Sequence, residues 1–170
     1  RAVLNFHPTN DPIDTVQNPP PTTSCPSITD RQAWKHALWF KEGIQISIIP
    51  GDGHCQWRAI QKGANLPQSV DTIRRDTTQH MRQNPHNYNL QYPDKQEWHR
   101  YLGEMSCLAW GDDNTLIAMA RLYNLHIGVR TGIGDTNLHV LKPEPICSTA
   151  KYVEVWYSGT PDQGHYDLVV

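Results

Sequence analysis

Residues 51–59 read Gly51-Asp52-Gly53-His54-Cys55-Gln56-Trp57-Arg58-Ala59. The two glycines permit a sharp turn of the backbone, and the residues after it have the composition of a helix that ends at Gly63. Cys55 is therefore predicted at a helix N-terminus, where the helix dipole favours a negative charge. Because cysteine attacks carbonyls as a thiolate, this position marks Cys55 as a candidate nucleophile.

The same turn supplies backbone N–H groups close to that cysteine. When a thiolate attacks a carbonyl carbon, the carbonyl oxygen becomes negative, and one well-aimed N–H donor stabilises the transition state by roughly 3–4 kcal/mol. The amides of Asp52, Gly53 and Cys55 are the candidates for such an oxyanion hole.

A histidine near the end of the chain is the candidate general base. The run Gly164-His165-Tyr166-Asp167 leads from a loop into the last predicted strand. Side chains two positions apart on a strand share a face, so Asp167 is expected beside the His165 ring, where a carboxylate fixes the tautomer. On residue type alone this pairing is a weak signal, because nine histidines and four cysteines offer many combinations.

Composition limits the classes of function. The formal net charge is -2, and Lys and Arg are scattered along the chain, which argues against nucleic-acid binding. Apolar runs are only a few residues long, whereas a membrane-spanning helix needs about 20, so no membrane segment is predicted. The four cysteines form no CxxC pair, which argues against a zinc site, and with no secretory signal they are predicted to be reduced thiols.

The order of predicted elements indicates the fold class. Apolar residues at spacings near 3.6 predict helices over residues 30–41, 56–62, 70–83, 94–105 and 113–123. Segments rich in β-branched and aromatic residues predict strands over residues 45–50, 125–130, 138–141, 152–157 and 166–170. Helices early and strands late predict an α/β (α+β) fold, in which helices flank a small mixed sheet.

Several blocks of the sequence together resemble the ovarian tumour (OTU) family of cysteine proteases. Residues 52–59 look like the family's Asp-Gly-x-Cys turn, which leads into a helix with an aromatic residue and an alanine. The other blocks follow in the family's order: Ile73-Arg74-Arg75, Tyr101-Leu102-x-x-Met105 with Trp110-Gly111, residues 116–129, and His165-Tyr166-Asp167. The resemblance covers residues 44–170, and Gln56, where many members carry an apolar residue, is a mild departure.

The resemblance implies a papain-related fold and a deubiquitinase. Such an enzyme hydrolyses the isopeptide bond after the C-terminal Gly-Gly of ubiquitin or a ubiquitin-like modifier, without metal or cofactor. By this resemblance Cys55 is the nucleophile and His165 the base. Asp167 matches the acid that follows the histidine and Asp52 the acid that precedes the cysteine, so both are candidates for the group that orients His165.

The resemblance also implies how the substrate is bound. Trp110, Gly111 and Tyr166 are expected to line a narrow slot that admits the Gly-Gly tail and excludes larger side chains. The expected partner is ubiquitin or polyubiquitin, the expected state is a monomer, and the expected compartment is the cytoplasm, or the host cytoplasm for a viral or effector protein.

Domain organisation follows from the proline-rich start of the chain. Residues 1–28 match nothing in the family pattern and include Asn18-Pro19-Pro20-Pro21, a composition that favours extended or irregular backbone. We therefore predict an arm or linker over residues 1–28 and an OTU-like catalytic domain over residues 29–170. The first residue is Arg rather than Met, which suggests a segment excised from a longer polypeptide.

Two other functions stay open at this point. The excised start is compatible with a viral polyprotein-processing cysteine endopeptidase, although the final residues contain no Gly-Gly cleavage site. A catalytically inactive ubiquitin-binding module is the alternative outside the enzyme class. Such a module usually lacks the nucleophile or the base, and both are present here.

Overall fold

The computed structural model describes residues 29, 32, 33, 35, 41, 43–107, 109–131, 137–143, 148–160 and 163–170. The predicted arm over residues 1–28 lies outside the described residues, and so does most of the helix predicted over residues 30–41. The helices of the described part are α2 (Cys55–Ala64), α3 (Val70–Gln83), α4 (Lys95–Cys107) and α5 (Asp113–Leu122), with short 3-10 turns η1 (Pro85–Asn87) and η2 (Asn89–Gln91). The strands are β1 (Ile46–Ser47), β2 (Leu125–Arg130), β3 (Leu138–Leu141), β4 (Lys151–Thr160) and β5 (Gln163–Val169).

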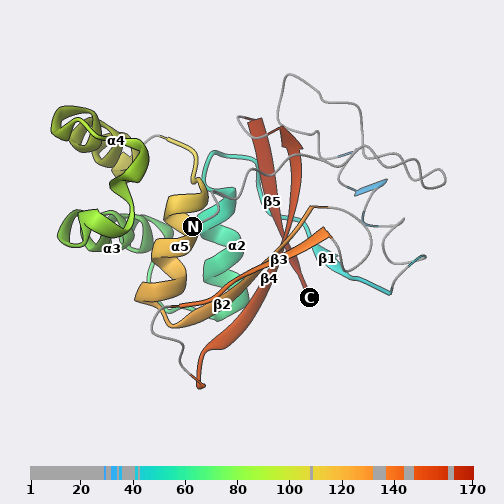
Figure 1. The fold of residues 1–170 in the computed structure, drawn as a ribbon. Coiled ribbons are helices and arrows are strands. Elements are labelled where there is room, and N and C mark those ends of the chain that lie inside the picture. The colour runs from blue at the N-terminus through green and yellow to red at the C-terminus, as the bar shows by residue number, and fades with distance from the viewer. Residues whose placement is uncertain are drawn as a thin grey trace.

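The strands form one mixed sheet in the order β1-β5-β4-β2-β3. Only β2 and β4 pair in parallel within the described sheet, and the other neighbouring strands are antiparallel. Figure 1 shows α2 and α5 against the sheet, with α3 and α4 farther from it. The predicted α/β class, with helices packed on a small mixed sheet, is confirmed.

Two apolar clusters hold these layers together. The larger cluster joins α2 and α5 to the sheet and includes Trp57, Ile60 and Val155, which are fully buried. The smaller cluster joins α3, α4 and α5 around Trp98 and Leu102. Because the first cluster lies between α2 and β5, it fixes the relative position of these two elements.

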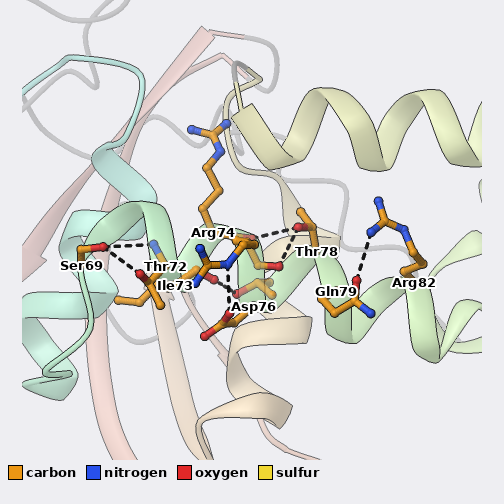
Figure 2. Close-up of polar contacts among 10 residues, drawn as sticks. Ser69, Thr72, Ile73, Arg74, Asp76, Thr78, Gln79 and Arg82 are labelled. Atoms are coloured by element: carbon orange, nitrogen blue, oxygen red, sulfur yellow. Dashed lines mark hydrogen bonds and ion pairs between the residues drawn. The ribbon is translucent and has the colours of Figure 1, made fainter.

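Helix starts follow the capping residues that the sequence offers. The Ser69 hydroxyl accepts a hydrogen bond from the Thr72 amide at the start of α3 (Figure 2). Asp112 and Thr115 form a reciprocal capping box at the start of α5. Each such cap satisfies an amide that has no partner within its own helix, which explains why these helices begin where they do.

The end of α2 corrects one expectation. Gly63 does not end the helix, which continues to Ala64 and is followed by Asn65 in the left-handed region at φ 54°. A Cβ on Gly63 would lie 2.5 Å from Cγ1 of Val153. The glycine is therefore needed for the close approach of α2 to β4 rather than for helix termination.

The strands differ in length from the predicted ranges. β1 spans only Ile46–Ser47, whereas β5 begins at Gln163, three residues earlier than expected. His165 consequently lies within the sheet, where it pairs with Ser158 of β4, rather than at the entry of the strand. In the described part of the chain, no helix combines the length and the apolar character needed to cross a membrane.

Candidate active site

Cys55 is the first residue of α2, as the sequence predicts. The turn before it forms because Gly53 adopts φ +82°, a conformation that side chains disfavour, and because Asp52 Oδ1 accepts a hydrogen bond from the His54 amide at 3.1 Å. The Cys55 amide lies in the first helical turn, where N–H groups have no partner within the helix. The thiol is free and 8% exposed.

His165 and Asp167 lie on one face of β5. His165 Nε2 donates to Asp167 Oδ1 at 3.1 Å, and both side chains are almost fully buried. The Ile49 amide also donates to Asp167 Oδ1, at 2.7 Å. The segment after β1 therefore holds the carboxylate, and the carboxylate holds the imidazole.

The Cys55 side chain is the second hydrogen-bond partner of His165. Burial lowers the pKa of His165, but the hydrogen bonds with Asp167 and Cys55 outweigh burial and raise this pKa to about 9. A protonated imidazole at neutral pH stabilises a thiolate beside it.

Asp52 lies apart from this cluster. Its carboxylate accepts from Arg58 Nη2 at 2.7 Å and from Arg58 Nε at 3.0 Å, and both side chains are partly exposed. The hydrogen bond from Arg58 is the main cause that lowers the pKa of Asp52. The Asp52 carboxylate thus binds Arg58, whereas the carboxylate that binds His165 is that of Asp167.

The residues expected to line a slot divide into two environments. Trp110 is 41% exposed, and its Nε1 lies 3.6 Å from the position of a Cβ on Gly53, so its indole borders the turn before Cys55. Tyr166 is buried in the same cluster as Cys55 and packs on Tyr157 with ring centroids 4.9 Å apart. Tyr166 thus supports the site from within the core instead of presenting its ring to solvent.

Two buried polar residues next to the turn were not predicted as site residues. Gln56 donates from Nε2 to the Asp112 carbonyl at 3.1 Å. Arg74 donates from Nη1 to His54 Nδ1 at 2.9 Å, and its guanidinium lies over the Trp57 ring at 5.2 Å. For Gln56 the sequence offers one signal: it follows Cys55 at a position where many members of the resembled family carry an apolar residue.

A helix-borne thiol beside a strand-borne imidazole and carboxylate is the arrangement of a cysteine protease. Residues 50–166 match the sequence model of the family described as OTU-like cysteine protease, and this match spans most of the 170 residues. The chain belongs to the OTU-like cysteine protease family, so the resemblance found in the sequence is confirmed. No curated protein sequence matches the chain.

Solved structures of OTU proteins are similar to this chain in fold. The OTU domain of OTUD1 is 19% identical with a TM-score of 0.65, over 82% of this chain and 93% of that chain. An OTU domain in complex with ubiquitin is 19% identical with a TM-score of 0.56, over 75% and 69%. An OTU deubiquitinase from Wolbachia pipientis wMel is 13% identical with a TM-score of 0.56, over 76% and 89%.

Proposed function

We propose that this protein is a deubiquitinase that hydrolyses isopeptide bonds at the C-terminal Gly-Gly of ubiquitin or of a ubiquitin-like modifier. The observation that carries the proposal is the buried contact of Cys55, His165 and Asp167 on an OTU fold. Similar structures that were solved with bound ubiquitin support ubiquitin as the partner.

The proposed reaction begins with the thiolate of Cys55. Its sulfur attacks the carbonyl carbon of the terminal glycine, and protonated His165 then gives its proton to the lysine nitrogen as the C–N bond breaks. Water, deprotonated by His165, hydrolyses the resulting thioester and frees Cys55. Asp167 accepts from Nε2 throughout, which keeps the imidazole directed at the reacting atoms.

The turn amides are the proposed stabilisers of the developing oxyanion. The His54 amide already donates to Asp52 Oδ1, so it is engaged in the turn itself. The Cys55 amide lies at the helix N-terminus beside the thiol, and we assign the oxyanion hole to it together with the amides of Asp52 and Gly53. Asp52 thus acts through its backbone, while its side chain shapes the turn.

The chemistry of the thiol also bears on the compartment in which the protein acts. A free thiol nucleophile suits a reducing compartment, so we propose that the protein acts in a cytoplasm, as a monomer that binds ubiquitin or polyubiquitin. The mutual contact of nucleophile, base and carboxylate favours an enzyme over a catalytically inactive binding module.

Cleavage of a ubiquitin C-terminal amide that releases a fluorophore tests the proposed activity. We expect turnover by the wild-type chain and none by Cys55→Ala, with circular dichroism confirming that the variant is folded. Cys107→Ser is the matched control, because Cys107 is a free and exposed thiol at the end of α4, where its Sγ donates to the Gly103 carbonyl. Undiminished cleavage by folded Cys55→Ala, or loss of cleavage in Cys107→Ser, would contradict the proposal.

A further inference from the structure

The loop between α4 and α5 lies beside the turn that precedes Cys55. Of this loop, residues 109–112 are described, and they have no regular secondary structure. Trp110 projects from it with 41% of its surface exposed, and its indole borders Gly53. The ends of the loop are tied to the flanking helices, where the Ala109 amide donates to the Glu104 carbonyl and the Asp112 carbonyl accepts from the Leu116 amide. Side chains from α2 and α3 that bind the backbone of the loop add to these contacts and help to set its position.

Gln56 binds the C-terminal end of this loop. Its side chain is 1% exposed, its Nε2 donates to the Asp112 carbonyl at 3.1 Å, and its Oε1 accepts from the Thr115 hydroxyl at 2.7 Å. A Cβ on Gly111 would overlap the Gln56 amide, so the glycine lets the loop lie directly on this side chain. Gln56 also hydrogen bonds the hydroxyl of Tyr166 in the core.

Arg74 binds the N-terminal end of the same loop. Its side chain is 2% exposed; Nη2 donates to the Ala109 carbonyl and Nε to the Met105 carbonyl at 2.7 Å. The third donor, Nη1, reaches His54 Nδ1 at 2.9 Å. The backbone of Arg74 is itself fixed in α3, where its carbonyl accepts from the Thr78 hydroxyl (Figure 2).

Gln56 and Arg74, the two anchors of the loop, are both connected to the immediate neighbourhood of Cys55. His54 and Gln56 flank Cys55, and each is linked to one end of the loop, His54 through Arg74 and Gln56 directly. We propose that Gln56 and Arg74 are positioning residues, which hold the loop so that Trp110 forms a fixed wall for the C-terminal tail of the substrate. This inference rests on the proposed function.

Removal of the Gln56 amide should weaken substrate binding but leave the reactivity of the Cys55 thiol unchanged. Loss of the Gln56 amide leaves the Asp112 carbonyl and the Thr115 hydroxyl without that partner, which loosens the loop and misplaces Trp110. The hydrogen bond of His165 to Asp167 lies in β5 and is retained. KM for a ubiquitin substrate should therefore rise, while the intrinsic reactivity of Cys55 stays the same.

Gln56→Met is the first variant, because methionine keeps the length and unbranched shape of glutamine without its polar atoms. Gln61→Met is the matched control: Gln61 lies on the same helix, and its amide donates to the Gln68 carbonyl at 2.6 Å, away from the loop. Arg74→Lys tests the other end, because lysine lacks the planar fork that reaches several carbonyls at once.

Three measurements are made on each folded variant. They are hydrogen–deuterium exchange of peptides covering residues 109–112, the separate values of kcat and KM, and alkylation of Cys55 by iodoacetamide against pH. For Gln56→Met we expect about tenfold faster exchange in the loop and about tenfold higher KM, which lies within the range for the loss of the two hydrogen bonds of the Gln56 amide. The alkylation rate, read on the Cys55 peptide, should stay within about twofold of wild type at each pH, because the hydrogen bond of His165 to Asp167 is retained beside the thiol. Gln61→Met should match wild type throughout.

The outcomes separate this inference from the proposed function. Unchanged loop exchange in both Gln56→Met and Arg74→Lys would overturn the inference even if wild type cleaves ubiquitin. Equal losses in kcat and alkylation rate, with KM unchanged, would also overturn it, because they place the effect on the thiol. If wild type fails to cleave ubiquitin, the proposed function fails and the tail-binding role fails with it, while exchange still decides whether the anchors hold the loop.

Discussion

His165 and Asp167 lie within a hydrogen-bonded strand, whereas Trp110 and Gly111 lie in a loop that depends on side chains for its position. Strand β4 pairs with both residues of the first pair, at Ser158 and Trp156. The second pair is held by the amide of Gln56 and the guanidinium of Arg74. The backbone of the sheet therefore fixes the proposed catalytic residues, whereas buried polar side chains help to hold the loop that carries the proposed binding wall, Trp110.

The largest effect on kcat is expected for a substitution in β5. His165→Ala removes the group that exchanges protons with Cys55 and the leaving amine, so kcat should fall by about 100- to 10,000-fold. KM should change little, because the loop with Trp110 is untouched. Steady-state kinetics on a fluorogenic ubiquitin substrate measure both values, and a loss confined to KM would erase the distinction between the two regions.

The two candidate carboxylates give the next largest contrast. Asp167→Asn removes the charge beside His165 but keeps an Oδ1 that can accept from the Ile49 amide, and we expect kcat to fall about 100-fold or more. Asp52→Asn keeps the acceptor for the His54 amide and loses only a partly exposed ion pair with Arg58, so kcat should change less than about threefold. A larger loss in Asp52→Asn would reverse the assignment.

The pH dependence of kcat/KM tests the contact between His165 and Asp167 in β5. The pKa of His165 is raised from 6.5 to about 9, because the hydrogen bonds with Asp167 and Cys55 outweigh burial. The protonated imidazole should therefore persist below pH 9 and be lost above it, which places the falling limb of kcat/KM near pH 9. Asp167→Asn should move that limb to lower pH, and a wild-type limb near 6.5 would contradict the account.

The raised pKa of His165 also affects stability, with a defined sign. The contribution from its protonated form is fully present below about pH 6.5 and is lost as the pH rises through about 9. Urea unfolding of wild type at pH 6 and pH 10, compared with His165→Ala, measures this contribution. The difference between the two proteins should shrink at the higher pH, and a constant difference would count against the shift.

The smallest effects are expected on the free energy of unfolding, when glycines in α2 and in α4 are replaced by alanine. Gly63→Ala places a Cβ against Val153 in the sheet layer and should destabilise the fold by about 1–3 kcal/mol. Gly103→Ala in α4 meets open space and should stabilise it by about 0.5–1 kcal/mol. Urea unfolding of both variants checks the signs, and equal effects would show that α2 does not pack on β4 as described.

Local patterns predicted the helices α3, α4 and α5 well, because their apolar stripes and caps lie within a few residues of one another. The juxtaposition of His165 and Asp167 was accessible for the same reason, since alternation along a strand sets it. The predicted end of α2 at Gly63 was wrong, because Gly63 is needed for packing on Val153, a residue in a distant segment of the chain. The engagement of Asp52 by Arg58 was not foreseen either, because it depends on how the turn enters the helix.

The anchors of the loop were out of reach for a related reason. Gln56 meets Asp112 and Thr115 more than 50 positions along the chain, and Arg74 meets Ala109 after 35. No periodicity encodes such contacts, and a buried glutamine reads in sequence as an ordinary polar residue. Only the packing of α2 and α3 around residues 109–112 gives these two side chains a common role.

The most direct test of the central claim is intact-mass analysis after mixing the protein with ubiquitin that carries a C-terminal electrophile. Wild type and Cys107→Ser should each form one ubiquitin-sized adduct, mapped to Cys55, and Cys55→Ala should form none. The absence of an adduct from folded wild-type protein, or an adduct that persists in Cys55→Ala, would contradict the assignment of Cys55 and His165 as the reactive pair of a deubiquitinase.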